Sequence, residues 1–241
     1  MKEVRFFYVP DASVNDELPE EEAAHAVRVL RLGIGDELML MDGEGTYYEA
    51  VITEATKKRC FYRITKSIPQ PKQWSAHLHL AMAPTKNMDR TEWLAEKATE
   101  IGFDELTFIE TKFSERKVVK TDRIDRILVS AMKQSHKATK PVLNGMTSFR
   151  DFIHQDFIGG KYICHCYGDD NEIKLGEKHL LRDVLVKGED ALVMIGPEGD
   201  FSVEEVAEAE AAGFVSVSLG ESRLRTETAA LIAVHMMSLF C

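Results

Sequence analysis

The stretch IGPEGDFSVEE, residues Ile195–Glu205, follows a short apolar run and precedes a helical pattern. Its glycine-bounded segment GPEG predicts a stiff bend where a strand passes into a helix. Ser202 and Glu205 have the spacing of a capping box, which predicts a helix that begins at Val203. Residues 196–201 are therefore expected to form an exposed loop at the carboxyl end of a strand.

A second bend of the same kind follows in the stretch SVSLGESRLRTETAALIA, residues 216–233. It predicts a strand, a polar loop over Gly220–Arg225 and a helix from near Thr226. Ligands of open parallel sheets bind outside the carboxyl ends of the strands, so two such loops could wall a small-molecule pocket, although ordinary loops share this pattern. The sequence has neither a Walker loop nor G-x-G-x-x-G after a strand, so we expect a ligand that is not held by phosphates.

Short apolar runs alternate with helical patterns from Trp74 to the end of the chain. This alternation, with nearly continuous apolar strands, is typical of an α/β domain with a buried parallel sheet. The strands are predicted at Ala76–Met82, Leu106–Glu110, Tyr162–Tyr167, Ala191–Ile195 and Phe214–Leu219. The helices are predicted at Asp89–Ile101, Asp122–Lys137, Gly176–Val186, Val203–Ala212 and Glu227–Phe240.

The first part of the chain has a different pattern. Residues Glu37–Ile68 predict three strands joined by tight turns, as in a β meander. One helix is predicted before them, over Glu20–Leu32, with its basic residues along one side. Because IPQPKQ (Ile68–Gln73) predicts a linker, we expect a small β-barrel domain over residues 1–72 and an α/β domain over residues 73–241.

The charge of the chain is unevenly distributed. The formal net charge of −10 argues against a protein that coats nucleic acid indiscriminately. Residues 112–140, however, carry nine Lys or Arg against three Asp or Glu, whereas residues 151–222 carry five against sixteen. A basic sector on an acidic protein suggests an anionic partner such as RNA on one face, with a solvated helix surface as the alternative.

The N-terminus lacks a signal-peptide core, and no apolar run is long enough to cross a bilayer, so a cytoplasmic protein is expected. Cys164-His165-Cys166 lies in a predicted strand, where alternate residues share a face. We therefore expect two thiols that point into a core rather than a metal site. His77 and His79 are likewise expected to be strand residues, not ligands.

The motifs of this chain resemble those of a known family along nearly its whole length. IGPEGDFSVEEV and AGFVSVSLGESRLRTETAALIA resemble the two C-terminal motifs of the RsmE family of SPOUT methyltransferases. HAVRVLRLGIGDELMLMDGEG resembles the N-terminal PUA-like barrel of that family. KNMDRTEWLAEKATEIGFDELTFIETKFSERKVV resembles the start of its catalytic domain, and AMKQSHKATKP the helix that follows.

The resemblance implies a fold and a reaction. The family uses S-adenosylmethionine to methylate N3 of one uridine in bacterial 16S ribosomal RNA, so the chain is expected to be an rRNA methyltransferase that acts on the small ribosomal subunit. The fold implied is a PUA-like β-barrel followed by a SPOUT domain in which both loops lie inside a C-terminal trefoil knot. A homodimer is implied as well, in which the partner chain completes each active site.

Two positions depart from the family pattern. The family usually shows a glycine where this chain has Asp200, and the carboxylate could change the loop conformation or favour the positive sulfonium of the cofactor. Where the family often reads Glu-Gln-Ser-Gly-Arg, this chain has KQSHK, residues 133–137. That segment is still basic, so contact with RNA remains part of the expectation.

Three residues are candidates for catalysis. Glu198 could accept the N3 proton or orient the base, its alternative being a cap for the next helix. Arg225 could stabilise charge on the uracil carbonyls or contact a phosphate, its alternative being an ion pair with Glu227 or Glu221. Arg116 could reach the target from the partner subunit, its alternative being an ordinary surface cation.

Cofactor and RNA candidates follow from the same motifs. Main-chain groups of the two loops are expected to bind S-adenosylmethionine: Ile195, Gly196, Pro197, Gly199, Leu219, Gly220, Leu224 and Thr226. Basic residues are expected to bind RNA: Arg28, Arg31, Lys57, Lys58, Arg59, Lys133, His136 and Lys137. The last three also lie near a helix C-terminus, where cations oppose the helix dipole without any RNA. No metal is expected.

Two other functions remain open on the sequence alone. The chain could be a non-catalytic RNA-binding factor for ribosome assembly, with a vestigial cofactor pocket. It could also be a SPOUT methyltransferase of a different RNA nucleotide. Cofactor binding without turnover would indicate the first, and methylation at another nucleotide the second.

Overall fold

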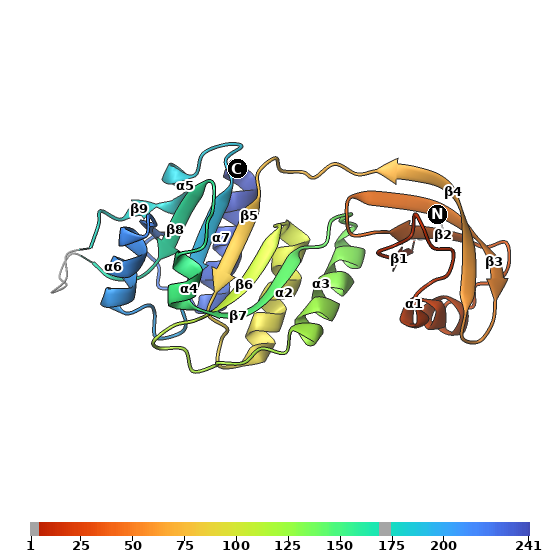
Figure 1. Ribbon diagram of the computed structural model, residues 1–241, viewed down its shortest axis with the longest axis horizontal. Helices are drawn as coiled ribbons and strands as arrows, with labels where there is room; N and C mark the ends of the chain where they lie inside the picture. Colours follow the sequence, from red (N-terminus) through yellow and green to blue (C-terminus); the bar gives the residue numbers. More distant parts are fainter. Residues whose placement is uncertain (1–4, 169–174) are drawn as a thin grey trace. The chain divides into compact units, whose positions relative to one another are not determined.

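The computed structural model of the chain describes residues 5–168 and 175–241, which divide into two compact units (Figure 1). The first unit contains the described residues up to Gln73 together with Met132–Lys140. The second contains Trp74–Ala131 and the described residues of Pro141–Cys241. Each unit has an apolar core of its own.

The first unit is a four-stranded sheet in the order β1-β2-β3-β4. The predicted meander is confirmed, because β2, β3 and β4 are antiparallel neighbours, and β1 pairs with β2 in parallel. Alternate side chains of these strands fill one core, as the period of a strand requires. The strands are β1 (Phe6–Tyr8), β2 (Glu37–Met41), β3 (Thr46–Ala55) and β4 (Cys60–Pro69).

The helix of the first unit is shorter than predicted. α1 (Glu20–Ala24) passes into one π-helical stretch, η1 (His25–Val29). Arg31 then has a φ of 57°, a left-handed conformation that cannot continue a right-handed helix. The predicted helix over Glu20–Leu32 is therefore too long, and Arg31 does not share a helix face with Arg28.

The segment Met132–Lys140 belongs to the first unit, although the sequence-based division places it in the second domain. Its backbone bonds to the turn between β2 and β3: the amide of Gly45 donates to the carbonyl of Ala138 at 3.0 Å, and the amide of Lys140 donates to the carbonyl of Gly43 at 2.8 Å. These long-range bonds have no local signal in the sequence.

The second unit is built on a seven-stranded parallel sheet in the order β7-β6-β5-β10-β8-β11-β9, which confirms the predicted parallel sheet. Its strands are β5 (Leu78–Met82), β6 (Glu105–Glu110), β7 (Val142–Ser148), β8 (Gly160–Cys164), β9 (His179–Leu180), β10 (Ala191–Ile195) and β11 (Val215–Ser218). Its helices are α2 (Met88–Ile101), α3 (Thr121–Ser135), α4 (Phe149–Ile153), α5 (Leu181–Val184), α6 (Val203–Ala211) and α7 (Thr226–Phe240). None of the helices in the described ranges is both long and apolar enough to cross a membrane.

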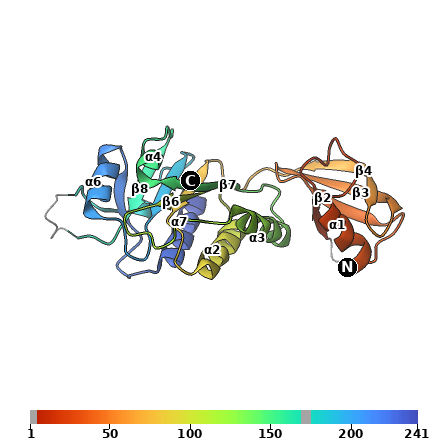
Figure 2. The same ribbon diagram turned by 60° about the horizontal axis from the view of Figure 1, so that its bottom comes forward.

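Helices cover both faces of this sheet (Figures 1 and 2). Leu80 and Val193 point to the face covered by α2 and α7, while Ala81 and Met194 point to the face covered by α4 and α6. Both faces of the central strands are therefore buried, which explains their nearly continuous apolar sequence. After β11 the chain returns across the sheet, because α7 packs on β5 and β10.

Several elements of the second unit differ from the prediction, among them the helix α4, which was not predicted. The helix predicted over Gly176–Val186 is wrong: the short strand β9 pairs there with β11, and α5 has a single turn. Strand β7, VLNGMTS, was not predicted because its Asn, Gly, Thr and Ser interrupt the apolar pattern. Strand β8 ends at Cys164, three residues before the predicted end.

A cluster of polar side chains lies at the amino ends of β5 and β6. Glu105 Oε2 bonds to His77 Nε2 at 2.8 Å, and its Oε1 accepts from the Asn144 amide at 2.6 Å. His79 Nε2 bonds to Thr107 Oγ1 at 2.8 Å. Burial lowers the pKa of His79 to about 4. Although burial alone would raise the pKa of Glu105, the two histidines and Asn144 together hold it below its ordinary value. Both histidines thus serve the structure of the sheet.

Candidate functional site

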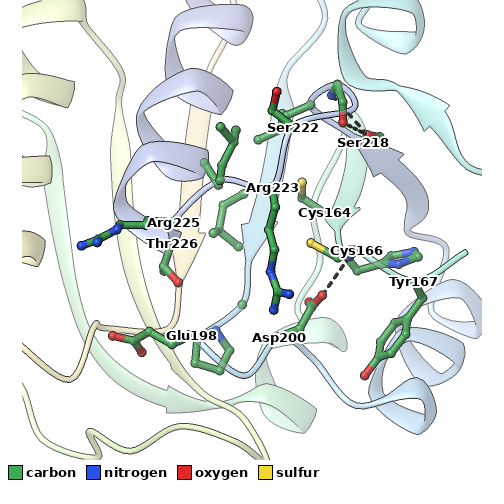
Figure 3. Close-up of a pocket in the computed structure, with 18 of the residues that line it drawn as sticks. Cys164, Cys166, Tyr167, Glu198, Asp200, Ser218, Ser222, Arg223, Arg225 and Thr226 are labelled. Atoms are coloured by element: carbon green, nitrogen blue, oxygen red, sulfur yellow. Dashed lines mark hydrogen bonds between the residues drawn. The ribbon is translucent and has the colours of Figure 1, made fainter.

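A cavity of about 1040 Å³ lies at the carboxyl ends of β8, β10 and β11 (Figure 3). The two loops that the sequence singled out form two of its walls, and the end of β8 forms a third. All eight residues predicted to bind the cofactor line it, from Ile195 in the first loop to Thr226 at the start of α7. The structure thus gathers these residues around one cavity, while their binding roles stay predictions.

The first loop, residues 196–201, is held by its own side chains. Asp200 has a φ of 64°, in the left-handed region that favours glycine. Its Oδ2 accepts the amide of Cys166 at 2.8 Å, and its Oδ1 accepts the amide of Phe201 at 2.8 Å. Short polar side chains tolerate this conformation when they bond locally. Asp200 therefore keeps a glycine-like backbone and ties the loop to the end of β8.

The predicted helix start after this loop is confirmed. Ser202 Oγ accepts the amide of Glu205 at 3.2 Å, and Glu205 Oε2 accepts the amide of Ser202 at 2.8 Å, which completes a capping box before Val203. The loop also has little space inside it, since a Cβ on Gly196 would lie 3.0 Å from the nitrogen of Phe201. Its main chain is therefore fixed before any ligand arrives.

The second loop, residues 219–225, is held by fewer hydrogen bonds. Ser218 Oγ accepts the amide of Gly220 at 3.2 Å and donates to its carbonyl at 2.9 Å. Gly220 has a φ of 129°, which other residues rarely adopt, and open space beside it. The side chains of Glu221, Ser222 and Arg223 are exposed. This wall of the cavity can therefore adjust its side chains to a ligand.

The third wall contradicts the expectation for the two cysteines. Because β8 ends at Cys164, Cys166 is exposed and Cys164 is half-buried, and both line the cavity instead of filling a core. Burial raises the pKa of the Cys164 thiol to about 12, so this thiol is neutral at physiological pH. Lys178 Nζ donates to the carbonyls of His165 and Tyr167 at 3.4 and 2.6 Å. These bonds hold the residues that follow the carboxyl end of β8.

His165 is buried between these two cysteines, and its hydrogen bonds define its tautomer. The Ser216 hydroxyl donates to Glu210 Oε1 at 2.5 Å, so its oxygen accepts from His165 Nε2 at 3.0 Å. Burial lowers the pKa of His165, which keeps the ring neutral. Its Nδ1 then carries a buried lone pair that has no partner among the described residues. No group of three or more potential metal ligands was found in the described parts of the chain.

Glu198 lies in the first loop and lines the cavity. Its Oε1 accepts the amide of Lys86 at 3.0 Å, so it does not cap α6, which Ser202 caps. Arg116 does not line the cavity; its Nη2 donates to the carbonyl of Lys86 at 2.8 Å. Glu198 and Arg116 thus hold the same residue from its two backbone groups, and Arg116 contacts the loop of its own chain.

Arg225 is the N-cap residue of α7 and lines the cavity. Its expected alternative, an ion pair with Glu227 or Glu221, is absent from the described residues. Glu227 instead faces Arg90, with 3.8 Å between Glu227 Oε1 and Arg90 Nε. Glu227 is only 8% exposed, and its Oε2 has no hydrogen-bond partner in the described structure.

Three cations that line the described part of the cavity were not predicted: Arg90, Lys178 and Arg223. Arg90 had a usable signal, because it follows the end of β5 and opens α2 at the same edge of the sheet. Arg223 lies inside a recognised motif but was passed over for its neighbour Arg225. Lys178 had no local signal, since it lies in a segment predicted as a helix.

All eight residues predicted to bind RNA lie in the first unit. Arg59 forms an exposed two-point ion pair with Glu17 at 2.6 Å, and its guanidinium stacks on Phe61. Arg28 Nε donates to the carbonyl of Lys57 at 3.0 Å. Arg28 in η1 therefore lies against the turn over residues 57–59, while the charge of Arg59 is partly neutralised by Glu17.

The segment 133–137 supplies the remaining candidates. Lys133 Nζ bonds to Glu22 at 2.5 Å, so its charge is partly neutralised. His136 has a φ of 52°, and its ring centroid lies 4.7 Å from that of Phe6. Burial lowers the pKa of Lys137. His136 occupies a position where the resembled family often has glycine, and it keeps the left-handed backbone that glycine allows.

Comparison with protein families gives two matches. The family model of an RNA methyltransferase domain matches residues 72–238. The model of an RNA methyltransferase PUA domain matches residues 18–65. Among curated proteins, the ribosomal RNA small subunit methyltransferase E of Rickettsia conorii is 27% identical over 226 residues, which cover 92% of this chain and 89% of that protein.

Solved structures match the whole chain as well. The crystal structure of a probable rRNA-methyltransferase from Porphyromonas gingivalis has a TM-score of 0.90 and 42% identity, covering 98% of this chain and 99% of that one. A ribosomal RNA small subunit methyltransferase E from Neisseria gonorrhoeae, bound to S-adenosyl methionine, has a TM-score of 0.80 and 26% identity, with coverage of 99% and 98%.

Proposed function

We propose, because the chain belongs to the RsmE family of RNA methyltransferases, that it transfers the methyl group of S-adenosylmethionine to N3 of one uridine in 16S ribosomal RNA. The observation that carries this proposal is the single cavity in which the two loops of the family motifs meet. The first unit supplies basic residues for the RNA, and the second supplies the cavity.

The residues around the cavity fit the cofactor. S-adenosylmethionine supplies a methyl group activated by a positively charged sulfur, and it has no phosphate. Correspondingly, the sequence has no phosphate-binding motif, and the cavity is lined in part by Gly196, Gly199 and Gly220, which offer only main-chain groups. Its volume of about 1040 Å³ is ample for a ligand of this size.

Methylation of N3 requires that the ring N–H lose its proton, and we assign this step to Glu198. The nitrogen lone pair forms the new bond to the methyl carbon, the carbon–sulfur bond breaks with its electron pair left on sulfur, and the carboxylate takes the proton. The amide of Lys86 donates to Glu198 Oε1, which leaves Oε2 as the proton acceptor and fixes its direction. Arg116 acts as a positioning residue, because it holds Lys86 through its carbonyl.

Negative charge spreads from N3 onto the flanking uracil carbonyls as the proton leaves. Arg225, exposed at the rim of the cavity, is proposed to stabilise this charge. Arg90 adds a second cation on the same wall, and the buried carboxylate of Glu227 orients it from behind.

The proposal extends to the partners of the chain. The eight basic candidates of the first unit are proposed to bind the 16S RNA, whose target base must leave its stack to reach the cavity. A homodimer is proposed as well, supported by the exposed apolar residues Leu239 and Phe240 at the end of α7. The trefoil knot implied by the family is compatible with the return of α7 across β5 and β10.

The test is transfer of radiolabelled methyl from S-adenosylmethionine to small ribosomal subunits that lack the modification, with naked 16S RNA in parallel. We expect label in 3-methyluridine at one site, in the substrate form that the enzyme requires. Cofactor binding without transfer to either substrate would refute the proposal and favour the assembly-factor function. Label in a different nucleoside would instead indicate a methyltransferase with another target.

A further inference from the structure

Among the described residues, four Lys or Arg side chains line the cavity, and three of them are engaged or directed elsewhere. Lys178 Nζ donates to two backbone carbonyls at the end of β8. Arg90 faces the buried carboxylate of Glu227. Arg225 points away from Asp200, toward the opposite side of the cavity from Cys166 (Figure 3). These three are therefore engaged or directed elsewhere.

Arg223 is the fourth cation, and it reaches into the cavity. Figure 3 shows its side chain running down between the two loops, with its guanidinium toward Asp200. No ion pair of Arg223 is found in the described parts of the chain, and the side chain is exposed. Its five N–H donors are thus available to a ligand.

No ion pair between Asp200 and the Arg223 guanidinium is found among the described residues. Each of its oxygens accepts a backbone amide, from Cys166 and from Phe201. A carboxylate oxygen has a second lone pair, so Asp200 still presents negative charge on the side that Arg223 approaches. The two loops therefore face one another with a free cation on one and a partly used carboxylate on the other.

We propose that Arg223 binds the α-carboxylate of the methionine end of S-adenosylmethionine, with Asp200 beside the α-ammonium. The proposal rests on the cofactor named in the proposed function. The adenosine end is uncharged and suits a main-chain wall, whereas the amino-acid end is a zwitterion that needs one charge of each sign. A planar guanidinium matches a carboxylate through two parallel hydrogen bonds.

The charge beside Arg223 favours this ligand over a phosphate of the RNA. A phosphate placed against Arg223 would also lie near Asp200, and two like charges at short range repel each other. An amino-acid zwitterion brings its ammonium group to the same carboxylate, so both of its charges are matched. The Arg223–Asp200 pair thus selects a zwitterion.

The experiment compares two ligands by titration calorimetry. S-adenosylmethionine has the amino-acid end, and 5′-methylthioadenosine lacks it. We expect Arg223→Gln to weaken binding of S-adenosylmethionine by about 10- to 100-fold, the range of a lost charge-assisted bond, and to leave 5′-methylthioadenosine within about 2-fold. Arg223→Lys keeps the positive charge but lacks the planar guanidinium that donates two parallel hydrogen bonds. It should therefore lose less affinity for S-adenosylmethionine than Arg223→Gln does. Arg182→Gln, the same change on exposed α5 outside the cavity, should affect neither ligand.

Each other outcome overturns the proposal. An equal loss for both ligands would mean that Arg223 supports the loop and not the carboxylate. Unchanged binding of S-adenosylmethionine, together with weaker binding of 16S RNA, would assign Arg223 to a phosphate. Thermal melting of each variant shows whether it is folded, and the exposed position of Arg223 makes unfolding an unexpected result.

The same data separate this proposal from the proposed function. If the wild-type protein binds S-adenosylmethionine but does not methylate 16S RNA, the function fails while the ligand comparison still decides the role of Arg223. If the wild-type protein binds 5′-methylthioadenosine and S-adenosylmethionine equally, the proposed carboxylate contact is refuted even when methylation occurs.

Discussion

The two ends of the seven-stranded sheet both carry polar side chains, but they use them differently. At the amino end, Glu105 bonds to His77 and Asn144, and Thr107 bonds to His79. No buried side-chain atom of that cluster lacks a partner in the described structure. At the carboxyl end, His165 Nδ1 and Glu227 Oε2 are buried without partners, in or beside the walls of the cavity.

This difference separates polar groups that stabilise the fold from polar groups that await a ligand. A buried polar group without a partner costs about 1–3 kcal/mol, so a native protein keeps it only where something compensates. The closed cluster at the amino end serves stability alone. The open groups at the carboxyl end lower stability, and under the proposed function the ligand of the cavity offsets this cost; Glu22 Oε2, in the first unit, is a third such atom without this account.

The largest expected effect is the loss of stability on Glu105→Ala at the amino end of the sheet. The substitution leaves Asn144 and His77 without their shared acceptor, and we expect the free energy of unfolding to fall by about 3 kcal/mol. Urea denaturation measures the loss. Affinity for S-adenosylmethionine in the folded protein should stay within about 2-fold; a parallel loss of affinity would show that the two ends are coupled.

The converse test at the carboxyl end is Glu198→Gln. The amide oxygen can still accept the Lys86 amide, so the loop should keep its position while the proton acceptor is lost. We expect the single-turnover rate of methyl transfer to fall about 100-fold, or about 2.7 kcal/mol, at saturating cofactor and RNA. The free energy of unfolding should change by less than about 0.5 kcal/mol. An unchanged rate would remove Glu198 from catalysis.

A smaller effect is expected from pH. Since burial lowers the pKa of His79 to about 4 from its ordinary 6.5, the unfolded chain takes up a proton below pH 6.5 that the folded protein refuses. The stability is therefore complete above pH 6.5 and declines as the pH falls toward 4. We expect His79→Phe to remove a large part of this decline, measured by urea denaturation across that range.

His165 provides the control for the pH experiment. Burial lowers its pKa too, so it should keep a remaining slope in the His79→Phe protein. A slope identical to that of the wild type would show that His79 is not the group responsible. The carboxyl end would then contribute to the acid sensitivity that the comparison assigns to the amino end.

Much of the fold was predictable where the signal is local. Strand β10 and the start of α6 agree with the prediction residue for residue, because a continuous apolar run and a capping box are encoded within a few positions. Strands β7 and β9 were missed, since their pairing depends on neighbours distant in sequence. The same reason explains why the packing of residues 132–140 with the first unit was not predicted.

The site was predictable to the same degree. The backbone walls of the cavity follow from two loops with recognisable glycines, and all eight predicted residues line it. The charged groups were harder, because Arg90 faces Glu227, and Lys178 bonds to the end of β8, only after distant segments fold together. The left-handed backbone at Asp200 and His136 was not predicted, although the family often has glycine at both positions and Asp and His adopt a positive φ more often than most residues do.

The chain passes between its two units three times, at residues 73, 131 and 140. Cutting the chain after the linker would therefore not yield an independent RNA-binding module. A fragment that ends at residue 72 would lack the segment Met132–Lys140, which bonds to the turn between β2 and β3. The Gly45 amide and the Gly43 carbonyl would then lose their partners, Ala138 and Lys140. For domain-swap or truncation work, residues 132–140 therefore have to accompany the first unit.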